Sequence, residues 1–250
     1  MLEREHSTMS TQLEAIVLKS FDYKDHHKIV KMISPSHGLI SVFVSHAGRK
    51  NSRYRMITEP LTLVTITAKL PREGNDIYFL IDGDVVEAFY DLKMDYEKVM
   101  IFYEMAMIIL KGDLQQGELP YTYRTLASVL AEGTTTEPIF MFRWRVLVFK
   151  AKMTVAVGIA PSVDGCVDCG TRSKIVTASA SQGGLICEDC YVGDGIWVVT
   201  DLIPLWRSLF KLPLESLLQL EIKASEVEVF ETWMKSYYEG FSNIKFAERL

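Results

Sequence analysis

The sequence lacks any long apolar run. Its longest stretch without Asp, Glu, Lys or Arg extends from Met32 to Gly48 and still contains Pro35, Gly38 and two histidines. A helix that spans a bilayer needs roughly 20 consecutive apolar residues, so no transmembrane helix is expected. Residues 1–14 mix charges without an apolar core, which is the wrong pattern for a secretory signal. We therefore expect a cytosolic protein.

The common catalytic motifs are also missing. The sequence contains no GxxxxGK[ST], GxGxxG, HExxH or GxSxG pattern, and all five histidines lie within the first 58 residues. Asp82 and Asp84 form an acidic pair, but they bracket Gly83, and this arrangement is more typical of a turn than of paired catalytic carboxylates. The sequence therefore predicts that the protein is not an enzyme.

Cysteine is scarce, but its placement is informative. The four cysteines form two CxxC pairs separated by 17 residues: Cys166 with Cys169, and Cys187 with Cys190. Each pair can direct two thiolates at one metal ion, and two pairs complete a tetrahedral site. Gly170 and the Gly183-Gly184 pair supply the left-handed or tight backbone that such loops need. The spacing predicts a zinc ribbon at about residues 162–195 that holds one structural Zn²⁺ by all four sulfurs.

Three other uses of these cysteines fit the pattern less well. Structural disulfides are uncommon in cytosolic proteins, and a thioredoxin-like redox site uses a single CxxC in a βαβ setting. A catalytic zinc site keeps an open coordination position, usually with a histidine or carboxylate ligand, yet the nearest histidine is His46. The metal is therefore expected to maintain shape and not to activate water.

Charge is unevenly distributed along the chain. The 250 residues carry 27 Lys or Arg and 32 Asp or Glu, a net charge of −5. Residues 1–58 nevertheless hold nine basic and five acidic residues, whereas residues 59–187 hold 12 and 16, and residues 188–250 hold 6 and 11. This asymmetry favours a basic amino-terminal part that meets a polyanion. The alternative is chance clustering on a solvated surface.

Short β-rich runs fill the first third of the chain. They are separated by turn signals at residues 34–38, 71–76 and 82–84. The expected strands are Ala15–Leu18, Ile29–Ile33, Leu39–Val44, Leu61–Ala68, and Ile77–Ile81 continuing into Val85–Phe89. Such a series predicts a small barrel. A five-stranded barrel of the oligonucleotide-binding (OB) type also accounts for a basic surface, although an SH3-like barrel gives much the same pattern.

After Asp91 the apolar spacing changes to that of helices. Expected helices are one through Val99 and Leu110 that ends at Gly112, then Tyr121–Ala131, Ile139–Val157, Asp201–Lys211, Leu214–Leu220 and Ser225–Tyr238. Ser225 and Glu228 form a capping-box pattern. The predicted fold class is α+β with several domains: an OB-fold nucleic-acid-binding barrel in residues 1–89, then an all-helical domain in residues 90–250 that carries the inserted four-cysteine zinc ribbon.

A basic stretch in the barrel half suggests a ligand. Residues 48–55 combine cations, an aromatic ring and small polar residues between two expected strands. Cations hold the phosphates of single-stranded nucleic acid, and aromatic rings stack on its bases. The candidate contacts are Arg49, Lys50, Arg53, Tyr54, Arg55, Lys24, Lys28 and Lys31. The alternative is a solvated loop without a partner.

Several short strings resemble the RecO family of bacterial recombination mediators. Glu14–Leu18, followed by Asp22-Tyr23 and Lys28–Val30, is similar to the family's first hairpin, and Gly48-Arg49-Lys50 is similar to its glycine and arginine loop. Gly158–Pro161 leads into the first cysteine pair as in that family. The resemblance covers about Leu13 to Phe246.

The resemblance implies a DNA repair and homologous recombination mediator without catalytic turnover. Such a protein binds single- and double-stranded DNA, anneals complementary strands and, with RecR, helps to load RecA onto strands coated by single-strand-binding protein. The resemblance also implies a cytoplasmic, nucleoid-associated protein that grips the acidic tail of single-strand-binding protein, for which Arg143 and Arg145 are candidates. Two alternatives remain open: a zinc-ribbon adaptor that binds only proteins, and an RNA-binding barrel without annealing activity.

Overall fold

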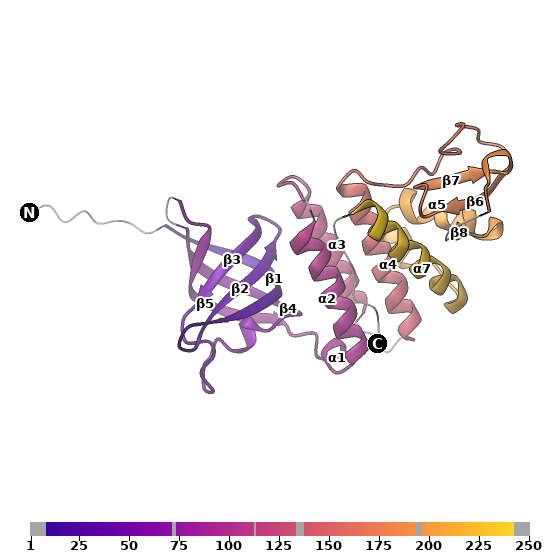
Figure 1. The fold of residues 1–250 in the computed structure, drawn as a ribbon. Coiled ribbons are helices and arrows are strands. Elements are labelled where there is room, and N and C mark those ends of the chain that lie inside the picture. The colour runs from indigo at the N-terminus through magenta and orange to yellow at the C-terminus, as the bar shows by residue number, and fades with distance from the viewer. Residues whose placement is uncertain (1–8, 72–73, 113, 134–137, 194–196, 243–250) are drawn as a thin grey trace, which may run out of the picture. The chain divides into compact units, whose positions relative to one another are not determined.

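Figure 1 shows the computed structural model of the chain. The chain divides into two compact units. The structure describes residues 9–71, 74–112, 114–133, 138–193 and 197–242. One unit is formed by Met1–Val99 with Leu119–Ala127, and the other by Met100–Glu118 with Ser128–Leu250. The domain boundary expected at residues 89 and 90 stays a prediction. Among the described residues, none of the helices is both long and apolar enough to cross a bilayer.

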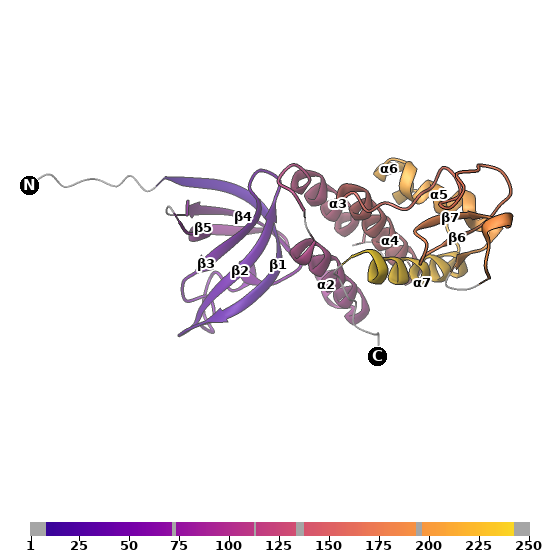
Figure 2. The same ribbon diagram turned by 45° about the horizontal axis from the view of Figure 1, so that its top comes forward.

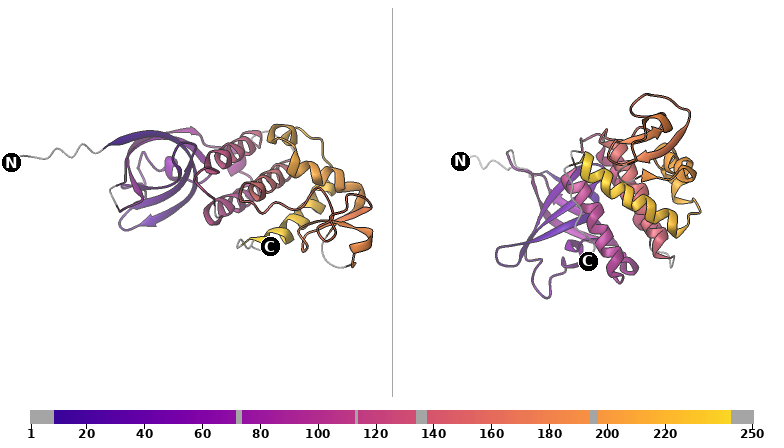
Figure 3. Two further views of the ribbon diagram at one scale, coloured as in Figure 1. Left: turned by 90° about the horizontal axis from the view of Figure 1, so that it is seen from above. Right: turned by 45° about the vertical axis from the view of Figure 1, so that its right-hand side comes forward.

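The first unit contains a closed barrel of five strands in the order β1-β2-β3-β5-β4. Its strands are β1 (Ser10–Tyr23), β2 (His27–Ser34), β3 (Gly38–Val44), β4 (Thr62–Lys69) and β5 (Ile77–Glu87). The long β1 pairs with β4 through its first half and with β2 through its second half. β3 and β5 close the barrel as a parallel pair, and the ring of strands is visible from above in Figure 3. This strand order confirms the OB-type barrel.

Alternation along the strands builds the barrel core. Val30 and Met32 of β2 and Ile40 and Val42 of β3 point inward with apolar residues of the other strands, while the residues between them face outward. Such alternation follows from the pleat of a strand, which directs successive side chains to opposite faces. The barrel therefore has an outer face whose composition is independent of its core.

The turn predicted at Asp82–Asp84 is wrong, because this segment lies within β5. Two irregularities in the pairing of β4 with β5 let the strand continue, and Gly83 lies close against β4. A Cβ atom at Gly83 would be 2.9 Å from Cγ2 of Ile66, so the glycine serves close strand packing. The turn expected at residues 71–76 falls between β4 and β5, but Arg72 and Glu73 lie outside the described residues.

Helices follow the barrel as the apolar spacing predicts. They are α1 (Tyr90–Lys93), α2 (Tyr96–Lys111), α3 (Leu119–Glu132), α4 (Ile139–Ala156), α5 (Ile203–Lys211), α6 (Leu214–Leu218) and α7 (Ala224–Phe241). α4 lies against α5, α6 and α7 and is buried over most of its circumference, and Figure 2 shows α7 alongside it. The predicted capping box is misplaced, because Oε2 of Glu226, not Glu228, accepts the backbone N–H at the start of α7.

The cysteine-containing segment forms a small sheet in the order β7-β6-β8. Its strands are β6 (Ile175–Ser179), β7 (Gly184–Cys187) and β8 (Trp197–Val198). The indole N–H of Trp233 in α7 donates to the carbonyl oxygen of Ala178 in β6 at 2.9 Å, and the Trp233 ring stacks on Tyr237. Aromatic residues of α7 therefore anchor this sheet to the helices. Of the predicted ribbon, residues 194–195 lie outside the described residues.

Candidate nucleic-acid interface and metal centre

Two segments that are distant in sequence meet at one end of the barrel. The backbone N–H of Gly48 donates to the carbonyl oxygen of His26 at 2.8 Å, and that of His46 donates to Nδ1 of His27 at 3.1 Å. A Cβ atom at Gly48 would lie 3.2 Å from Cα of His26, so a side chain there would push the two closely approaching backbones apart. The β1–β2 turn and the loop after β3 thus form one ridge.

The exposed cations of this ridge are Lys24 from the turn and Arg49 and Lys50 from the loop, and we call these three residues the basic ridge. The backbone around them is unusual, because Lys24, His26 and His46 have φ angles of 46°, 68° and 56°. Non-glycine residues adopt this left-handed region at a cost, and such residues cluster at functional sites. The structure therefore brings together three of the predicted cationic residues on a constrained backbone.

Arg53 and Tyr54 are instead held against β5. Arg53 Nη2 lies 3.0 Å from Oδ1 of Asp82, its guanidinium carbon is 4.5 Å from the centre of the Tyr54 ring, and Tyr54 Oη donates to the carbonyl oxygen of Ile81 at 3.1 Å. The hydrogen bond with Tyr54 and then the charge of Asp82 raise the pKa of Arg53. Arg55 is exposed and precedes a short 3-10 helix at Met56–Thr58.

The two predicted lysines of β2 have different environments. Lys28 forms an ion pair with Asp22 at 3.3 Å. Lys31 lies on the outer face of the barrel, where its Nζ donates to Oγ of Ser41 at 2.6 Å. Lys31 is therefore part of an outer surface, whereas Lys28 is tied to the neighbouring strand.

A row of apolar side chains, not predicted from the sequence, lies on this outer face. Phe21 of β1 is paired with Ile29 of β2, Ile29 with Phe43 of β3, and Phe43 with Phe79 of β5. We call these four residues the ring row. Phe21 is 43% exposed and Phe79 is 39% exposed, and the rings of Phe43 and Phe79 are 5.5 Å apart.

Rows of other side chains flank the ring row. Lys19, Lys31 and Ser41 are in register on one side, and Tyr23 and His27 on the other. Nζ of Lys19 lies 4.9 Å from the centre of the Phe21 ring. The two-residue alternation of a strand groups Lys19, Phe21 and Tyr23 on one face of β1, but it does not indicate which face points away from the core.

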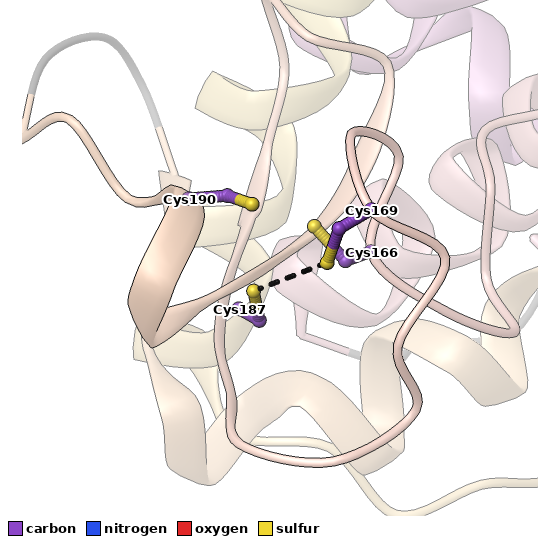
Figure 4. A group of neighbouring side chains, drawn as sticks. All are labelled: Cys166, Cys169, Cys187 and Cys190. Carbon is purple, nitrogen blue, oxygen red and sulfur yellow. Dashed lines mark hydrogen bonds between the residues drawn. The ribbon is translucent and has the colours of Figure 1, made fainter.

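The four cysteines converge in the second unit (Figure 4). Their sulfur atoms all lie within 4.8 Å of one another, and those of Cys169 and Cys187 are 3.6 Å apart. Cys166 and Cys169 come from the loop before β6, Cys187 ends β7, and Cys190 ends the short 3-10 helix Glu188–Cys190. The two CxxC pairs therefore form one cluster, as their spacing predicts.

Glycines at the predicted positions shape these loops. Gly170, directly after the first pair, has a φ of 75°, and its N–H donates to the carbonyl oxygen of Cys166 at 2.9 Å. Gly183 has a φ of 79°. A Cβ atom at Gly184 would lie 2.5 Å from the carbonyl oxygen of Ser162, so no side chain fits there. The backbone requirement inferred from the sequence is confirmed.

In the sulfur cluster one thiol loses its proton readily, whereas deprotonation of a further thiol is disfavoured. Burial acts to raise the pKa of Cys166, but backbone N–H groups of Cys169, Cys187 and Asp168 outweigh it and lower that pKa to about 6. Hydrogen bonding with the sulfurs of Cys187 and Cys169 raises the pKa of Cys190. Thiolates crowded at this distance need a cation between them, and a set of four sulfur donors fits a tetrahedral Zn²⁺ site.

Arg143 and Arg145 lie on α4 beside carboxylates. Nη1 of Arg143 is 3.7 Å from Oε2 of Glu231. Nη2 of Arg145 is 3.9 Å from Oε2 of Glu132, and only 3% of the Arg145 side chain is exposed. Arg145 lines a pocket of about 410 Å³ whose apolar wall includes Leu218.

A second pocket, of about 310 Å³, also lies within the helical unit. Its apolar lining includes Ile108, Met153 and Val157, and its one lining cation among the described residues is the exposed Lys111. No carboxylate belongs to the described residues that line it. This pocket suits an apolar group that carries negative charge nearby.

Comparison with known proteins identifies the family. Residues 9–89 match the model described as Recombination protein O N terminal, and residues 119–240 match the one described as Recombination protein O C terminal. The chain belongs to the RecO family. The resemblance inferred from the short strings is thereby confirmed, and the two matched regions contain the barrel and the sulfur cluster, respectively.

Individual RecO proteins align along almost their whole length. The chain is 26% identical over 243 residues to the DNA repair protein RecO of Bacillus pumilus (strain SAFR-032), covering 94% of this chain and 91% of that protein. It is 23% identical over 239 residues to the DNA repair protein RecO of Listeria monocytogenes serotype 4a (strain HCC23), with the same coverage. For that of Shouchella clausii (strain KSM-K16), identity is 23% over 244 residues, with 96% and 93% covered.

Proposed function

We propose that the chain acts in DNA repair and recombination as a non-catalytic mediator, which binds single- and double-stranded DNA and anneals complementary strands. The observation that carries this proposal is the basic ridge, where backbone hydrogen bonds hold the β1–β2 turn and the loop after β3 together. Among the described residues, no carboxylate lies within ion-pair distance of Lys24, Arg49 or Lys50. Their charge is therefore available to phosphates.

Neutralised phosphates explain both binding and annealing. Each Lys or Arg that contacts a phosphate releases condensed counterions, which gives binding a steep dependence on salt. Two strands that are both partly neutralised repel each other less, so complementary bases meet more often. Arg55 adds an exposed cation and Lys31 a half-buried one, whereas Arg53 and Lys28 contribute to DNA binding only after exchanging Asp82 and Asp22 for phosphate.

One Zn²⁺ is proposed for the sulfur cluster, held by Cys166, Cys169, Cys187 and Cys190. Bound there, zinc would supply a cross-link between the two cysteine loops. All four coordination positions would be filled by sulfur, which favours a structural role over a catalytic one. The proposed role of this zinc is to hold the fold of the ribbon.

The proposed protein partners are RecR, single-strand-binding protein and, indirectly, RecA. For the acidic tail of single-strand-binding protein, Arg143 and Arg145 stay the proposed contacts, and binding requires the tail to displace Glu231 and Glu132. The pocket beside Lys111 is the alternative binding site for the tail, because the tail would displace no carboxylate among its described lining residues. A labelled acidic tail peptide is titrated with each variant. Its affinity should fall for Arg143→Ala/Arg145→Ala and stay at the wild-type value for Lys111→Ala. The reverse result would assign the contact to the Lys111 pocket.

Salt-dependent binding tests the proposed function. If about five phosphates are neutralised, log K for single-stranded DNA falls with log[salt] at a slope near −3.5, since each phosphate contributes roughly 0.7. A protein-only adaptor gives a slope near zero, and an RNA-binding barrel prefers matched RNA because it contacts the 2′-hydroxyl.

A matched pair of variants tests the site. Arg49→Ala/Arg53→Ala should lose strand annealing, whereas the control Lys235→Ala, an exposed position on α7, should retain it. Equal annealing by the double variant and the wild type would contradict the site assignment. Circular dichroism of both variants checks that the fold is intact.

A further inference from the structure

The basic ridge does not explain why the outer face of the barrel exposes aromatic rings. Phe21, Phe43 and Phe79 lie in one register line across β1, β3 and β5, with Ile29 of β2 between the first two. Neighbouring strands are about 4.8 Å apart. The rings thus form a continuous apolar line and not isolated exposed residues.

Sheet stabilisation accounts for only part of this arrangement. Cross-strand ring pairs stabilise a sheet, and Phe43 makes such contacts with Phe79 at 5.5 Å and with Tyr23 at 6.1 Å. Phe21 has no aromatic neighbour among the described residues, yet it remains 43% exposed with Lys19 at its ring. Lys19 lies over this ring, and the ring still keeps exposed surface that cross-strand ring pairing does not use.

The charges around the ring row favour a negatively charged ligand. Lys19 and Lys31 occupy the adjacent row, and Lys69 of β4 is paired with Phe79 at the end of the line. The nearby carboxylates Asp22 and Asp82 are engaged by Lys28 and Arg53. Cations therefore flank a line of rings, which matches a strand whose phosphates and bases lie side by side.

We propose that the ring row stacks on unpaired bases. It thereby distinguishes single-stranded from double-stranded DNA and releases a strand once that strand is paired. This inference rests on the proposed function. Phosphates are present in both forms of DNA, so the basic ridge binds both. Bases of a duplex stack on each other and do not present their faces to a protein ring. Annealing therefore removes the ring contacts and leaves only phosphate contacts with the product.

An oligonucleotide without bases tests the proposal on the wild-type protein. The full chain is titrated with a 20-nucleotide single strand, an abasic strand of equal length and the matching duplex, all at one salt concentration. The abasic strand and the duplex should bind at least about tenfold more weakly than the normal strand, because each stacked base contributes roughly fivefold or more and the row carries three rings. Equal binding of the normal and abasic strands would overturn the proposal.

Variants locate the effect. Phe21→Leu/Phe43→Leu/Phe79→Leu should bind the normal strand at least about tenfold more weakly, bind the abasic strand and duplex within about twofold of wild type, and keep the wild-type salt slope. The control Arg49→Gln/Lys50→Gln should weaken binding to all three. If the triple variant does not fold, the single variant Phe21→Leu replaces it. This variant changes the most exposed ring of the row and should weaken binding to the normal strand in the same way.

The outcomes separate this inference from the proposed function. If the wild type binds none of the three oligonucleotides, the proposed function fails. If it binds them but the ring variants still prefer the normal strand over the abasic one, only the inference fails. If the ring variants keep normal DNA binding and instead lose binding to a protein partner, the ring row is a protein-docking surface and the inference is overturned.

Discussion

The basic residues of the barrel and those of α4 have opposite surroundings. Arg49 and Lys50 are exposed on a loop of the barrel unit. In the helical unit, by contrast, the side chains of Arg145 and Lys150 are only 3% and 10% exposed and lie beside Glu132 and Glu104. The same residue types thus face solvent in one region and belong to the interior in the other.

The energetic difference follows from burial. A charge removed from water needs a partner that offsets the lost hydration, and Nζ of Lys150 lies 2.9 Å from Oε2 of Glu104. Lys152, also buried, donates to the carbonyl oxygen of Leu212 at 2.6 Å, just beyond the end of α5. Basic residues along a helix therefore do not by themselves indicate a ligand, whereas exposed cations gathered from two loops do.

Removal of the proposed zinc should separate the behaviour of the two units most strongly, because the sulfur cluster lies in the helical unit alone. Binding free energies of structural zinc in small modules are about 10 kcal/mol or more and become folding free energy. Chelation, or Cys169→Ser, should therefore unfold the ribbon around β6 and β7. Hydrogen exchange should accelerate there and stay slow in the barrel strands, while binding to DNA persists. Faster exchange in the barrel as well would show that the metal braces more than its own unit.

Removing one lysine from each region gives the next largest contrast. Lys150→Ala removes an ion pair with the largely buried Glu104, and breaking such a pair costs about 3–5 kcal/mol of unfolding free energy. Lys50→Ala, at an exposed position, should change stability by less than about 0.5 kcal/mol but weaken binding to DNA. Urea unfolding and DNA titration of both variants measure the contrast, and a similar loss of stability in the two would remove it.

The sulfur cluster and most strands could be predicted because their signals are local. The CxxC pairs and their glycines specify the sulfur cluster within 25 residues, from Cys166 to Cys190. The strand pattern failed at Gly83, since a glycine that permits close packing against Ile66 has the same sequence signature as a glycine in a turn.

The ring row was not predictable by the same means, because it depends on pairing between strands. Before Leu18, the odd-numbered residues Ala15 and Val17 face the barrel core; after it, Phe21 and Tyr23 face outward. An extra residue in β1 between the pairs Val17–Met32 and Lys19–Lys31 causes this change of face. Nothing in the sequence marks the position of that bulge, so the face of Phe21 follows only from the structure.

An intermediate case sharpens the comparison between free and engaged cations. Arg53 is exposed like the basic ridge but paired like the residues of α4, through Asp82. Asp82→Asn would free its charge, so binding to single-stranded DNA should tighten by a few-fold, within the roughly tenfold that corresponds to 1.4 kcal/mol. Titration of this variant and of Asp82→Asn/Arg53→Ala measures the effect. No gain in the single variant would place Arg53 outside the DNA path.

The smallest expected effect concerns His46, whose ring lies 4.8 Å from that of His27 beside the basic ridge. Desolvation, followed by the charges of Arg49, His27 and His26, lowers the pKa of His46 below its ordinary value of 6.5, so the imidazole is neutral at pH 7.

Bound phosphates oppose that shift and raise the pKa of His46, so binding takes up a proton and affinity should increase as the pH falls from about 7.5 to 5.5. In the free protein the sign is opposite: the unfolded chain binds the proton more readily, and folding stability declines as the pH falls below the unfolded value. DNA titrations across this range should show a gain of less than about tenfold, the change that one full unit of pKa produces. His46→Gln should flatten the profile, and an equally steep profile in this variant would assign the proton uptake to other groups.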